Sequence, residues 1–548
     1  MGESSIIVAD VSGNHAEGVA RAYGGAIYNA GTITGGEEGE LVVGNLIGNY
    51  VIGATEANGG AIYDTVSTKV AIDGDASGNY VKVTDNSDVA GGVIYLKKTE
   101  EGEGTTITVS GNVTESHAGT AGGSAYGGAF YTGKYDEENY DTVTISGEII
   151  SGNYVSAMEN ALGGAICNEG VLNIEEGVDL IGNYTVSTEG AAVGGAIFDT
   201  ISTEVHITGD ASDNYVKTLE GDVYGGVIYL TQAAEASTVI TARGDVSGNH
   251  TETENGSAYG GVFYTDEDDI VVIDCDISWN LVKASGDFMG GAVYNAGSLT
   301  LEDGVNLSGN YAKGAEAATG GAIAAMDSSS ITISWRVTGN YAESSDGDAA
   351  GGAISLADGS LTIEGDVTGN YAEGAGTVMG GAIVNMGELI VTGSITDNRA
   401  EGEEAAGGAI YNAGIMNIIA DSGLLSISGN TAVSGGAAED NAIYSDRWSE
   451  INITLSGIGE VLMNDSIDGE DYTVTVTSED AGSNTLYIYN DMNNADLIMG
   501  SITLNTINNE VHTYAIKSFS LSGDVIWTSV LMVSKMAPPT AAPSVDTV

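Results

Sequence analysis

Residues 361–385 read LTIEGDVTGNYAEGAGTVMGGAIVN, and this stretch contains both landmarks of a repeat that runs through most of the chain. One landmark is a glycine pair followed by a small and an apolar residue, here 380–383 (GGAI). The other is an asparagine, usually within Ser-Gly-Asn or Thr-Gly-Asn, here Asn370. Residues 361–364 alternate apolar and polar side chains, which is the period of a β-strand. The stretch therefore predicts short strands separated by turns that contain glycine.

Both landmarks recur with a mean spacing of 32 residues, since Asn14 and Asn430 lie 416 residues and thirteen steps apart. The glycine pairs begin at Gly24, Gly59, Gly91, Gly127, Gly163, Gly194, Gly225, Gly260, Gly290, Gly320, Gly351, Gly380 and Gly407. The asparagines are Asn14, Asn49, Asn79, Asn112, Asn153, Asn183, Asn214, Asn249, Asn280, Asn310, Asn340, Asn370, Asn398 and Asn430. A unit of this length with only a few short strands cannot bury a core alone, so it must stack on its neighbours.

We therefore predict an all-β chain that forms a right-handed parallel β-helix, or β-solenoid, of about 14 repeats. Residues 1–537 contain no proline, which suits central strands because proline removes a ladder hydrogen bond. Residues 1–445 form the repeat region, in which a block of four repeats is duplicated. Residues 446–534 are rich in strand-forming residues but lack the landmarks, so we predict an irregular C-terminal β-helical cap or stem. Residues 535–548 contain all three prolines and are predicted to be a flexible tail.

The landmark residues have an architectural interpretation, because they recur in nearly every repeat whereas an active site normally occurs once. The residue three places before each asparagine is mostly aliphatic and should form a ladder in the core. Asparagines stacked turn on turn should bond to one another along the axis. The members of this predicted ladder are Asn49, Asn79, Asn153, Asn183, Asn310, Asn340 and Asn370.

Tyrosines directly follow eight of the landmark asparagines and predict a discontinuous aromatic stripe. They are Tyr50, Tyr80, Tyr154, Tyr184, Tyr215, Tyr311, Tyr341 and Tyr371. The stripe has two interpretations, packing between turns or a face that binds carbohydrate or protein. The segments between each asparagine and the next glycine pair, such as 282–289 and 400–406, are predicted to be loops on one side of the molecule. Loops of this kind are the usual place for contacts with partners.

The charge balance excludes some classes of partner. The chain has 77 acidic and 15 basic residues and a formal net charge of −62, so it should repel nucleic acid and anionic lipid. No run of residues approaches the length of a membrane span, so we expect no membrane insertion by this chain. Two cysteines are too few for a disulfide scaffold. The first residues lack the features of a signal peptide, which implies a removed signal or another export route.

We find no pattern that indicates catalysis or a cofactor. Parallel β-helices that cut acidic polysaccharides gather carboxylates with Arg or Lys, but the five arginines here are scattered. The five histidines show no metal-ligand spacing, so we predict a protein that is not an enzyme. Two acidic segments could hold a weak calcium ion or could simply be solvated loops. The first contains Asp266, Asp268 and Asp269, and the second runs from Asp136 to Asp141.

The pairing of GGAI with aliphatic-x-x-Asn resembles the repeats of chlamydial polymorphic outer-membrane proteins and other bacterial autotransporter adhesin passengers. In the chlamydial proteins the second landmark is usually Phe-x-x-Asn, and here aliphatic residues replace the aromatic. The stretch from Gly500 to Val533 is similar to the end of a passenger just before its translocator. The resemblance implies an outward-facing β-helix on the bacterial surface.

The resulting functional hypothesis is a secreted or cell-surface β-helical adhesin-like rod that attaches through its side loops. Its partner would be a protein or glycan on a host cell or bacterium, and it would be extracellular or associated with the outer membrane. The first alternative is a structural filament or coat that forms by self-association. The second alternative is an enzyme that acts on polysaccharides.

Overall fold

The structure is a computed structural model that describes residues 4–29, 39–96, 104–133, 140–202, 204–231, 238–326, 329–478, 485–488, 492, 495–500, 503–505, 518–522 and 526–527. All regular elements in these ranges are β-strands. No helix long and apolar enough to cross a bilayer occurs among them. The chain divides into two compact units, which are Met1–Glu316 with Ala322–Ala324 (unit 1) and Ala317–Gly321 with Ala325–Val548 (unit 2).

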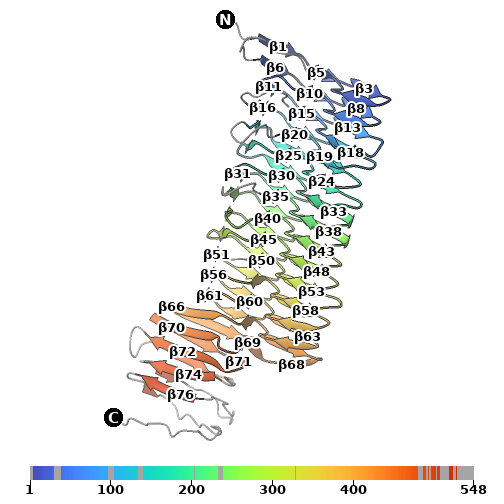
Figure 1. Cartoon of the computed structure of the whole chain (residues 1–548). Helices are drawn as coiled ribbons and strands as arrows, with labels where there is room; N and C mark the ends of the chain where they lie inside the picture. Colours follow the sequence, from blue (N-terminus) through green and yellow to red (C-terminus); the bar gives the residue numbers. More distant parts are fainter. Residues whose placement is uncertain are drawn as a thin grey trace. The chain divides into compact units, whose positions relative to one another are not determined.

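Each regular turn of unit 1 contains five short strands. One turn consists of β36 (Val239–Ala242), β37 (Val246–Ser247), β38 (His250–Asn255), β39 (Ala258–Tyr259) and β40 (Phe263–Thr265). Each of these strands pairs in parallel with its counterpart one turn later: β41 (Ile270–Ile273), β42 (Ile277–Ser278), β43 (Leu281–Ala284), β44 (Phe288–Met289) and β45 (Val293–Asn295). Equivalent strands therefore form five stacked rows, called rows 1 to 5 in the order in which a turn visits them, and Figure 1 shows row 3 as the stack that includes β33 (Tyr215–Glu220), β38 and β43.

Alternation of side chains explains how the turns bury a core. In β36, Ile240 and Ala242 point inward and are buried, while Val239 and Thr241 are partly exposed. Ile240 is in register with Val271 of the next turn, and Val271 with Leu299. The same kinds of side chain therefore lie above one another, which produces the aliphatic ladders expected from the sequence.

The glycine pair is needed for two separate reasons at the corner between rows 4 and 5. Gly225 has a φ of +59°, a backbone conformation that residues with a Cβ seldom adopt. Gly226 has no such φ, but a Cβ at this position would lie 2.0 Å from the carbonyl oxygen of Gly261 in the next turn. The first glycine permits the turn and the second permits the close approach of neighbouring turns.

Unit 2 begins with turns of the same kind and then changes. A regular turn contains β56 (Ser360–Ile363), β57 (Val367–Thr368), β58 (Tyr371–Gly374), β59 (Thr377–Met379) and β60 (Ile383–Asn385), and the next begins with β61 (Glu388–Val391) and β62 (Ile395–Thr396). Beyond these, β66 (Ile415–Ser428) and β70 (Glu450–Met463) each replace a row 1 and a row 2 strand by one long strand. One pair, β67 (Thr431–Ser434) with β68 (Ala437–Glu439), is antiparallel. Row 5 continues through β69 (Asn441–Ser445) and β71 (Ser466–Gly469). The strands described after β71 are β72 (Tyr472–Ser478), β73 (Thr485–Ile488), β74 (Ala495–Gly500), β75 (Thr503–Asn505), β76 (Ser518–Ser522) and β77 (Ile526–Trp527).

The predicted fold class is confirmed. The chain is all-β and forms a parallel β-solenoid, consistent with right-handed winding. Glycine pairs mark nine turns in unit 1 and four in unit 2, close to the predicted number of repeats. The predicted domain boundary at 445/446 falls within unit 2, and the predicted tail, 535–548, lies outside the described residues.

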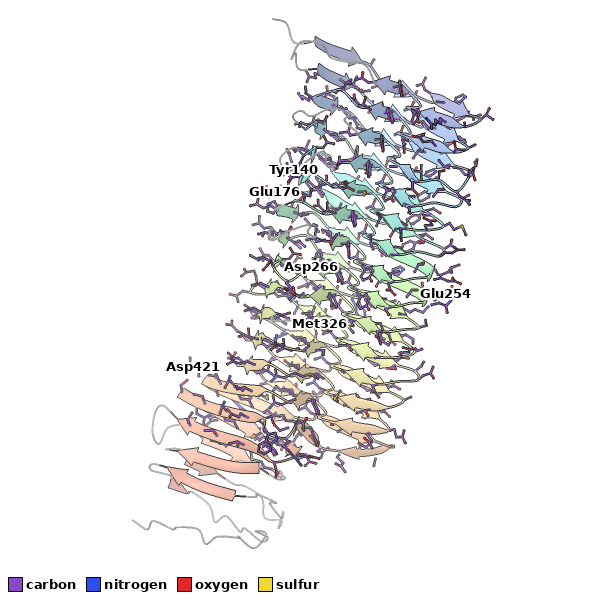
Figure 2. All side chains as sticks on the ribbon, in the orientation of Figure 1. Tyr140, Glu176, Glu254, Asp266, Met326 and Asp421 are labelled. Atoms are coloured by element: carbon purple, nitrogen blue, oxygen red, sulfur yellow. The ribbon has the colours of Figure 1, made fainter. Side chains whose placement is uncertain are left out.

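The prediction of loops between each asparagine and the next glycine pair is wrong. Segment 282–289 forms most of β43 and all of β44, and segment 400–406 lies in β63 (Arg399–Gly402) and β64 (Glu404–Ala406). Their many Ala and Gly residues resemble a loop, but small residues suit short strands joined by a tight turn. Turn length varies instead at the corner between rows 5 and 1, where two residues separate Asn168 from Val171 and nine separate Asn29 from Gly39. Figure 2 labels Asp266 at this corner and Glu254 near the corner between rows 3 and 4.

Candidate interaction sites on the solenoid turns

The predicted asparagine ladder lies at the corner between rows 2 and 3. Its bonding is clear at Asn183, whose backbone N–H and Nδ2 donate to Oδ1 of Asn214 at 2.9 and 3.1 Å. Nδ2 also donates to the carbonyl oxygen of Ile150 at 2.8 Å, and Oδ1 accepts the backbone N–H and Nδ2 of Asn153. Every hydrogen-bonding position of the amide is therefore used. All seven predicted members are fully buried: Asn49, Asn79, Asn153, Asn183, Asn310, Asn340 and Asn370.

One turn departs from the predicted register of this ladder. Ser116, not Asn112, stands between Asn79 and Asn153. The backbone N–H of Asn79 donates to Ser116 Oγ at 3.3 Å, and the backbone N–H of Ser116 donates to Asn153 Oδ1 at 3.0 Å. Asn112 lies four residues earlier in the chain and donates its backbone N–H to Asp75 Oδ1. The sequence indicated Asn112 because Ser-Gly-Asn occurs at 110–112, whereas Ser116, which occupies the ladder position, does not belong to such a tripeptide.

The predicted tyrosine stripe forms the start of row 3, and histidines fill its gaps. Eight rings of unit 1 stack continuously, with neighbouring centroids 4.5–5.0 Å apart and interplanar angles of 0–8°. They are His15, Tyr50, Tyr80, His117, Tyr154, Tyr184, Tyr215 and His250. Leu281 then separates His250 from Tyr311.

This geometry limits what the stripe can bind. A sugar or a flat ligand normally stacks on the face of an aromatic ring, but both faces of each interior ring are covered by its neighbours. Burial raises the pKa of Tyr184 to about 12 and lowers the pKa of His117 to about 4. Tyr184 and His117 are therefore partly desolvated, neutral rings that offer mainly their edges to solvent. The arrangement favours the packing interpretation of the stripe.

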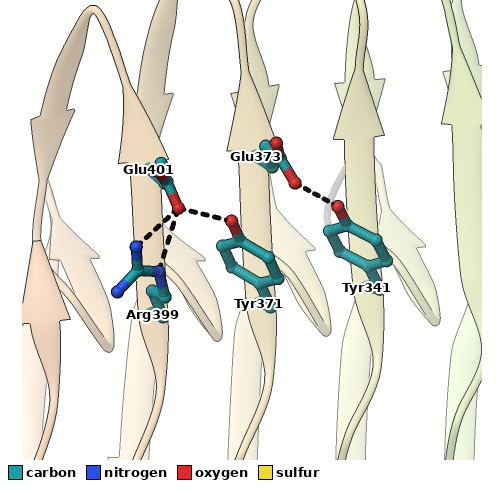
Figure 3. Close-up of polar contacts among 5 residues, drawn as sticks. All are labelled: Tyr341, Tyr371, Glu373, Arg399 and Glu401. Atoms are coloured by element: carbon teal, nitrogen blue, oxygen red, sulfur yellow. Dashed lines mark hydrogen bonds and ion pairs between the residues drawn. The ribbon is translucent and has the colours of Figure 1, made fainter. Parts of the chain in front are cut away.

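In unit 2 the tyrosines of the stripe form hydrogen bonds with carboxylates (Figure 3). The hydroxyl of Tyr371 donates to Glu401 at 2.6 Å, and the hydroxyl of Tyr341 donates to Glu373. Arg399 occupies the next tyrosine position and binds Glu401 through Nε at 3.0 Å and Nη2 at 2.6 Å. Hydrogen bonds from Tyr371 and Arg399 hold the pKa of Glu401 below its ordinary value. The tyrosines, the arginine and their carboxylates thus satisfy one another.

A second group of tyrosines flanks the glycine pairs and was missed from the sequence. In unit 1, Tyr224 and Tyr259 stack at 5.1 Å in row 4, and Tyr229, Tyr264 and Tyr294 stack at 4.7–5.0 Å in row 5. Rings of the two rows meet edge to face, as at Tyr259 and Tyr294. The available signal was a tyrosine directly before the glycine pair and another tyrosine three residues after it.

The structure does not bring the calcium candidates together as a metal site. Asp269 is 1% exposed, and its carboxylate accepts the backbone N–H groups of Asp266 and Thr238 at 2.9 and 3.1 Å. It therefore stabilises the corner between rows 5 and 1, while Asp268 is exposed. Asp141 accepts the backbone N–H of Thr105, as Asp269 accepts that of Thr238, and residues 136–139 of the second acidic segment lie outside the described residues. Within the described ranges no group of three or more His, Cys, Asp or Glu side chains could hold a metal ion.

Three tryptophans have exposed side chains, and two of them, Trp279 and Trp448, have positive φ values of +59° and +74°. Trp279 is 73% exposed, and Trp335 and Trp448 are 42% and 82% exposed. Trp279 occupies the corner between rows 2 and 3 with a φ of +59°. A bulky residue in this conformation is an outlier that costs roughly 1–3 kcal/mol.

Glycine occupies the same corner in the turns on either side of Trp279. Gly248 and Gly309 have φ values of +68° and +63°. The indole lies over Gly309, where a Cβ would meet ring atoms at 3.0–3.1 Å. The sequence carried a signal of this residue, because Ser-Trp-Asn replaces Ser-Gly-Asn at 278–280.

The chain was compared with protein-family models, with curated proteins and with solved structures, and none of the three comparisons finds a match.

Proposed function

We propose that this chain is a non-enzymatic, adhesin-like β-helix that acts outside the cell or on the bacterial surface, associated with the outer membrane. Its partner would be a protein or glycan on a host cell or another bacterium. The resemblance of its repeats to autotransporter passengers supports this assignment. The contact residues would be exposed side chains at the corners between rows, since the segments first interpreted as loops are strands.

The exposed indole of Trp279 is the observation that carries the proposal. The positive φ of Trp279 costs conformational free energy that a glycine at this position would not cost, and 73% of the side chain remains exposed to solvent. Within the fold the indole contacts one face of the corner, at Gly309, whereas a partner could cover the exposed part, and tryptophan is enriched among residues that dominate interfaces. Trp279 is therefore the proposed anchor for the partner.

The tyrosine stack is assigned a structural role in this proposal. Its interior rings have no free faces, and its unit 2 members bind carboxylates of the same chain. The acidic surface, which should keep the proteins apart in solution, counts against a filament as the primary function.

Binding of the purified, fluorescently labelled chain to epithelial cells, bacterial cells and glycan arrays tests the proposal. Trp279→Gly should weaken attachment by about ten-fold or more, the loss typical of a hot-spot tryptophan. The fold should survive, because glycine is found at this corner in neighbouring turns. The control is Asp397→Gly, which changes an exposed residue with a φ of +56° at the same kind of corner and removes no aromatic ring.

Attachment that is equally strong in the Trp279→Gly variant would overturn the role of this residue. No binding to any surface, together with filaments whose amount rises with protein concentration in electron micrographs, would replace the adhesin by the filament alternative. Turnover of acidic polysaccharides would instead support the enzyme alternative.

A further inference from the structure

Four successive turns of unit 1 place charged side chains at one register position of row 3, and three of the four are lysines. In chain order they are Lys217 of β33, Glu252 of β38, Lys283 of β43 and Lys313 of β48 (Tyr311–Gly314). Figure 1 shows these four strands in sequence along row 3. The whole chain has only 15 basic residues against 77 acidic ones, so this file of lysines is a local surface of opposite charge.

The single carboxylate of this file does not neutralise the two lysines beside it. Glu252 binds Nζ of Lys283 at 2.7 Å and Nζ of Lys217 at 3.5 Å, so the three groups keep an excess of one positive charge. The side chain of Lys283 remains 50% exposed. An ammonium group has three hydrogen-bond donors, and Lys283 can therefore bind an anion from solvent while it holds Glu252.

The same strand connects this charge to the exposed indole of Trp279. Asn280 and Val282 are buried. Trp279, Leu281 and Lys283 alternate with them and face outward, and we call these three residues the row 3 strip. Four residue steps separate the ends of the strip, so the Cα atoms of Trp279 and Lys283 are at most about 14 Å apart. A ligand that contacts both ends is longer than a single sugar or amino acid.

The indole favours a sugar ring at its end of the strip. It lies over Gly309 on one side, and 73% of the side chain is exposed, in contrast to the covered rings of the tyrosine stripe. A sugar ring stacks on an open aromatic face of this kind. The ammonium of Lys283 complements a carboxylate, which would accept a charge-assisted hydrogen bond.

Carboxylates on both sides of the strip limit how much negative charge the ligand can carry. Asp245 and Asp276 are exposed at the corner between rows 1 and 2, and Glu254 and Asp287 are exposed near the corner between rows 3 and 4. A densely charged polyanion or a strongly acidic peptide would be repelled by these side chains. Neutral sugars would not be repelled, and their hydroxyls are donors for the flanking carboxylates.

We infer that the row 3 strip binds an oligosaccharide in which neutral sugars adjoin a carboxylated sugar. A neutral ring stacks on the indole of Trp279, and the carboxylate of the charged sugar binds the ammonium of Lys283. This inference rests on the proposed attachment function, since it names the class of glycan that the Trp279 site recognises.

Saturation-transfer NMR of the full chain with sialyllactose tests the inference, with lactose as the uncharged control. Sialyllactose should bind, with the strongest saturation on a neutral ring, and lactose should bind about five-fold more weakly or less. Lys283→Gln should weaken the binding of sialyllactose by about five- to ten-fold, because it removes the charge-assisted contact. The same variant should leave the binding of lactose unchanged.

Lys82→Gln is the matched control for the loss of one positive charge. Lys82 is exposed at the same register position of row 3, six turns before Lys283. At about 4.8 Å per turn it lies about 29 Å from Lys283, well beyond the range of an unscreened charge. Lys82→Gln should therefore change the affinity for sialyllactose by less than about two-fold.

Equal affinities for sialyllactose and lactose, or equal effects of Lys283→Gln and Lys82→Gln, would overturn the inference. It would also be overturned if neither sugar bound while the chain still attached to cells through Trp279, a result that would leave the proposed function in place and favour a protein partner. Binding of sialyllactose that depends on Lys283, by a chain that attaches to no cell, would support the inferred site and overturn the proposed function instead.

Discussion

His117 stacks within the tyrosine stripe as a tyrosine would, but it also makes the stripe sensitive to pH. Its ring lies between Tyr80 and Tyr154, at centroid distances of 4.9 and 4.5 Å and nearly parallel to both. Burial lowers its pKa to about 4, with a smaller contribution from Lys82. The histidine thus packs as tyrosine does in other turns, but only while it is neutral.

The His117→Tyr substitution should make unit 1 less sensitive to acid. The folded pKa is lower than the unfolded value of about 6.5, so the unfolded chain binds a proton more readily. The stabilisation that the neutral ring contributes to folding is fully present above about pH 6.5 and is lost as the pH falls towards 4. Thermal unfolding followed by circular dichroism between pH 7 and 4 should show a smaller fall in Tm for the variant. An unchanged pH profile would contradict the buried, neutral state of His117.

At the scale of elements, the ladder between rows 2 and 3 joins successive turns through buried amides. Its members were predictable because Ser-Gly-Asn and Thr-Gly-Asn recur with a regular spacing. The presence of Ser116 in place of an asparagine could not be predicted, because no sequence landmark marks the position at which its hydroxyl replaces an amide. The strands of rows 3 and 4 were also missed, because their Ala and Gly residues do not have high strand propensity.

Asn183→Ala should destabilise the turns around it by about 2–5 kcal/mol. The substitution leaves the backbone N–H of Asn153 and one of the two Nδ2 hydrogens of Asn153 without an acceptor, while the other still donates to the carbonyl oxygen of Val113. Each buried unpaired donor costs roughly 1–3 kcal/mol. Asn45→Ala is the matched control, because Asn45 bonds to Asp10 and Asp75 where water can replace it. Hydrogen exchange followed by mass spectrometry should show lost protection across 150–215 only in the first variant. Equal protection in both variants would show that the ladder does not stabilise the stack.

At the scale of the whole molecule, the repeat period and the scarcity of proline were enough to predict the fold class. The properties of the candidate sites, in contrast, could be determined only from the structure. The tyrosine stripe could be found from the sequence, but only the ring stacking shows that its faces are covered. The long strand β66, which pairs with both β61 and β62, is likewise marked by no repeat landmark. Trp279 departs from the repeat because it replaces the glycine of Ser-Gly-Asn, and such a departure is where a repetitive chain can carry a specific site.

Every proposed site depends on the stacking of neighbouring turns in register. Ser247, Ser278 and Ser308 occupy equivalent positions in three successive turns of row 2. Cysteines at 247 and 278 would have Cα atoms about 4.8 Å apart, within disulfide range, whereas 247 and 308 would be about twice as far apart.

The decisive measurement is disulfide formation under mild oxidation, with Cys167 and Cys275 replaced by alanine. We expect Ser247→Cys with Ser278→Cys to form an intramolecular bridge in high yield and Ser247→Cys with Ser308→Cys to form none. Equal bridging in both variants, or bridging only in the second, would contradict the stacked register.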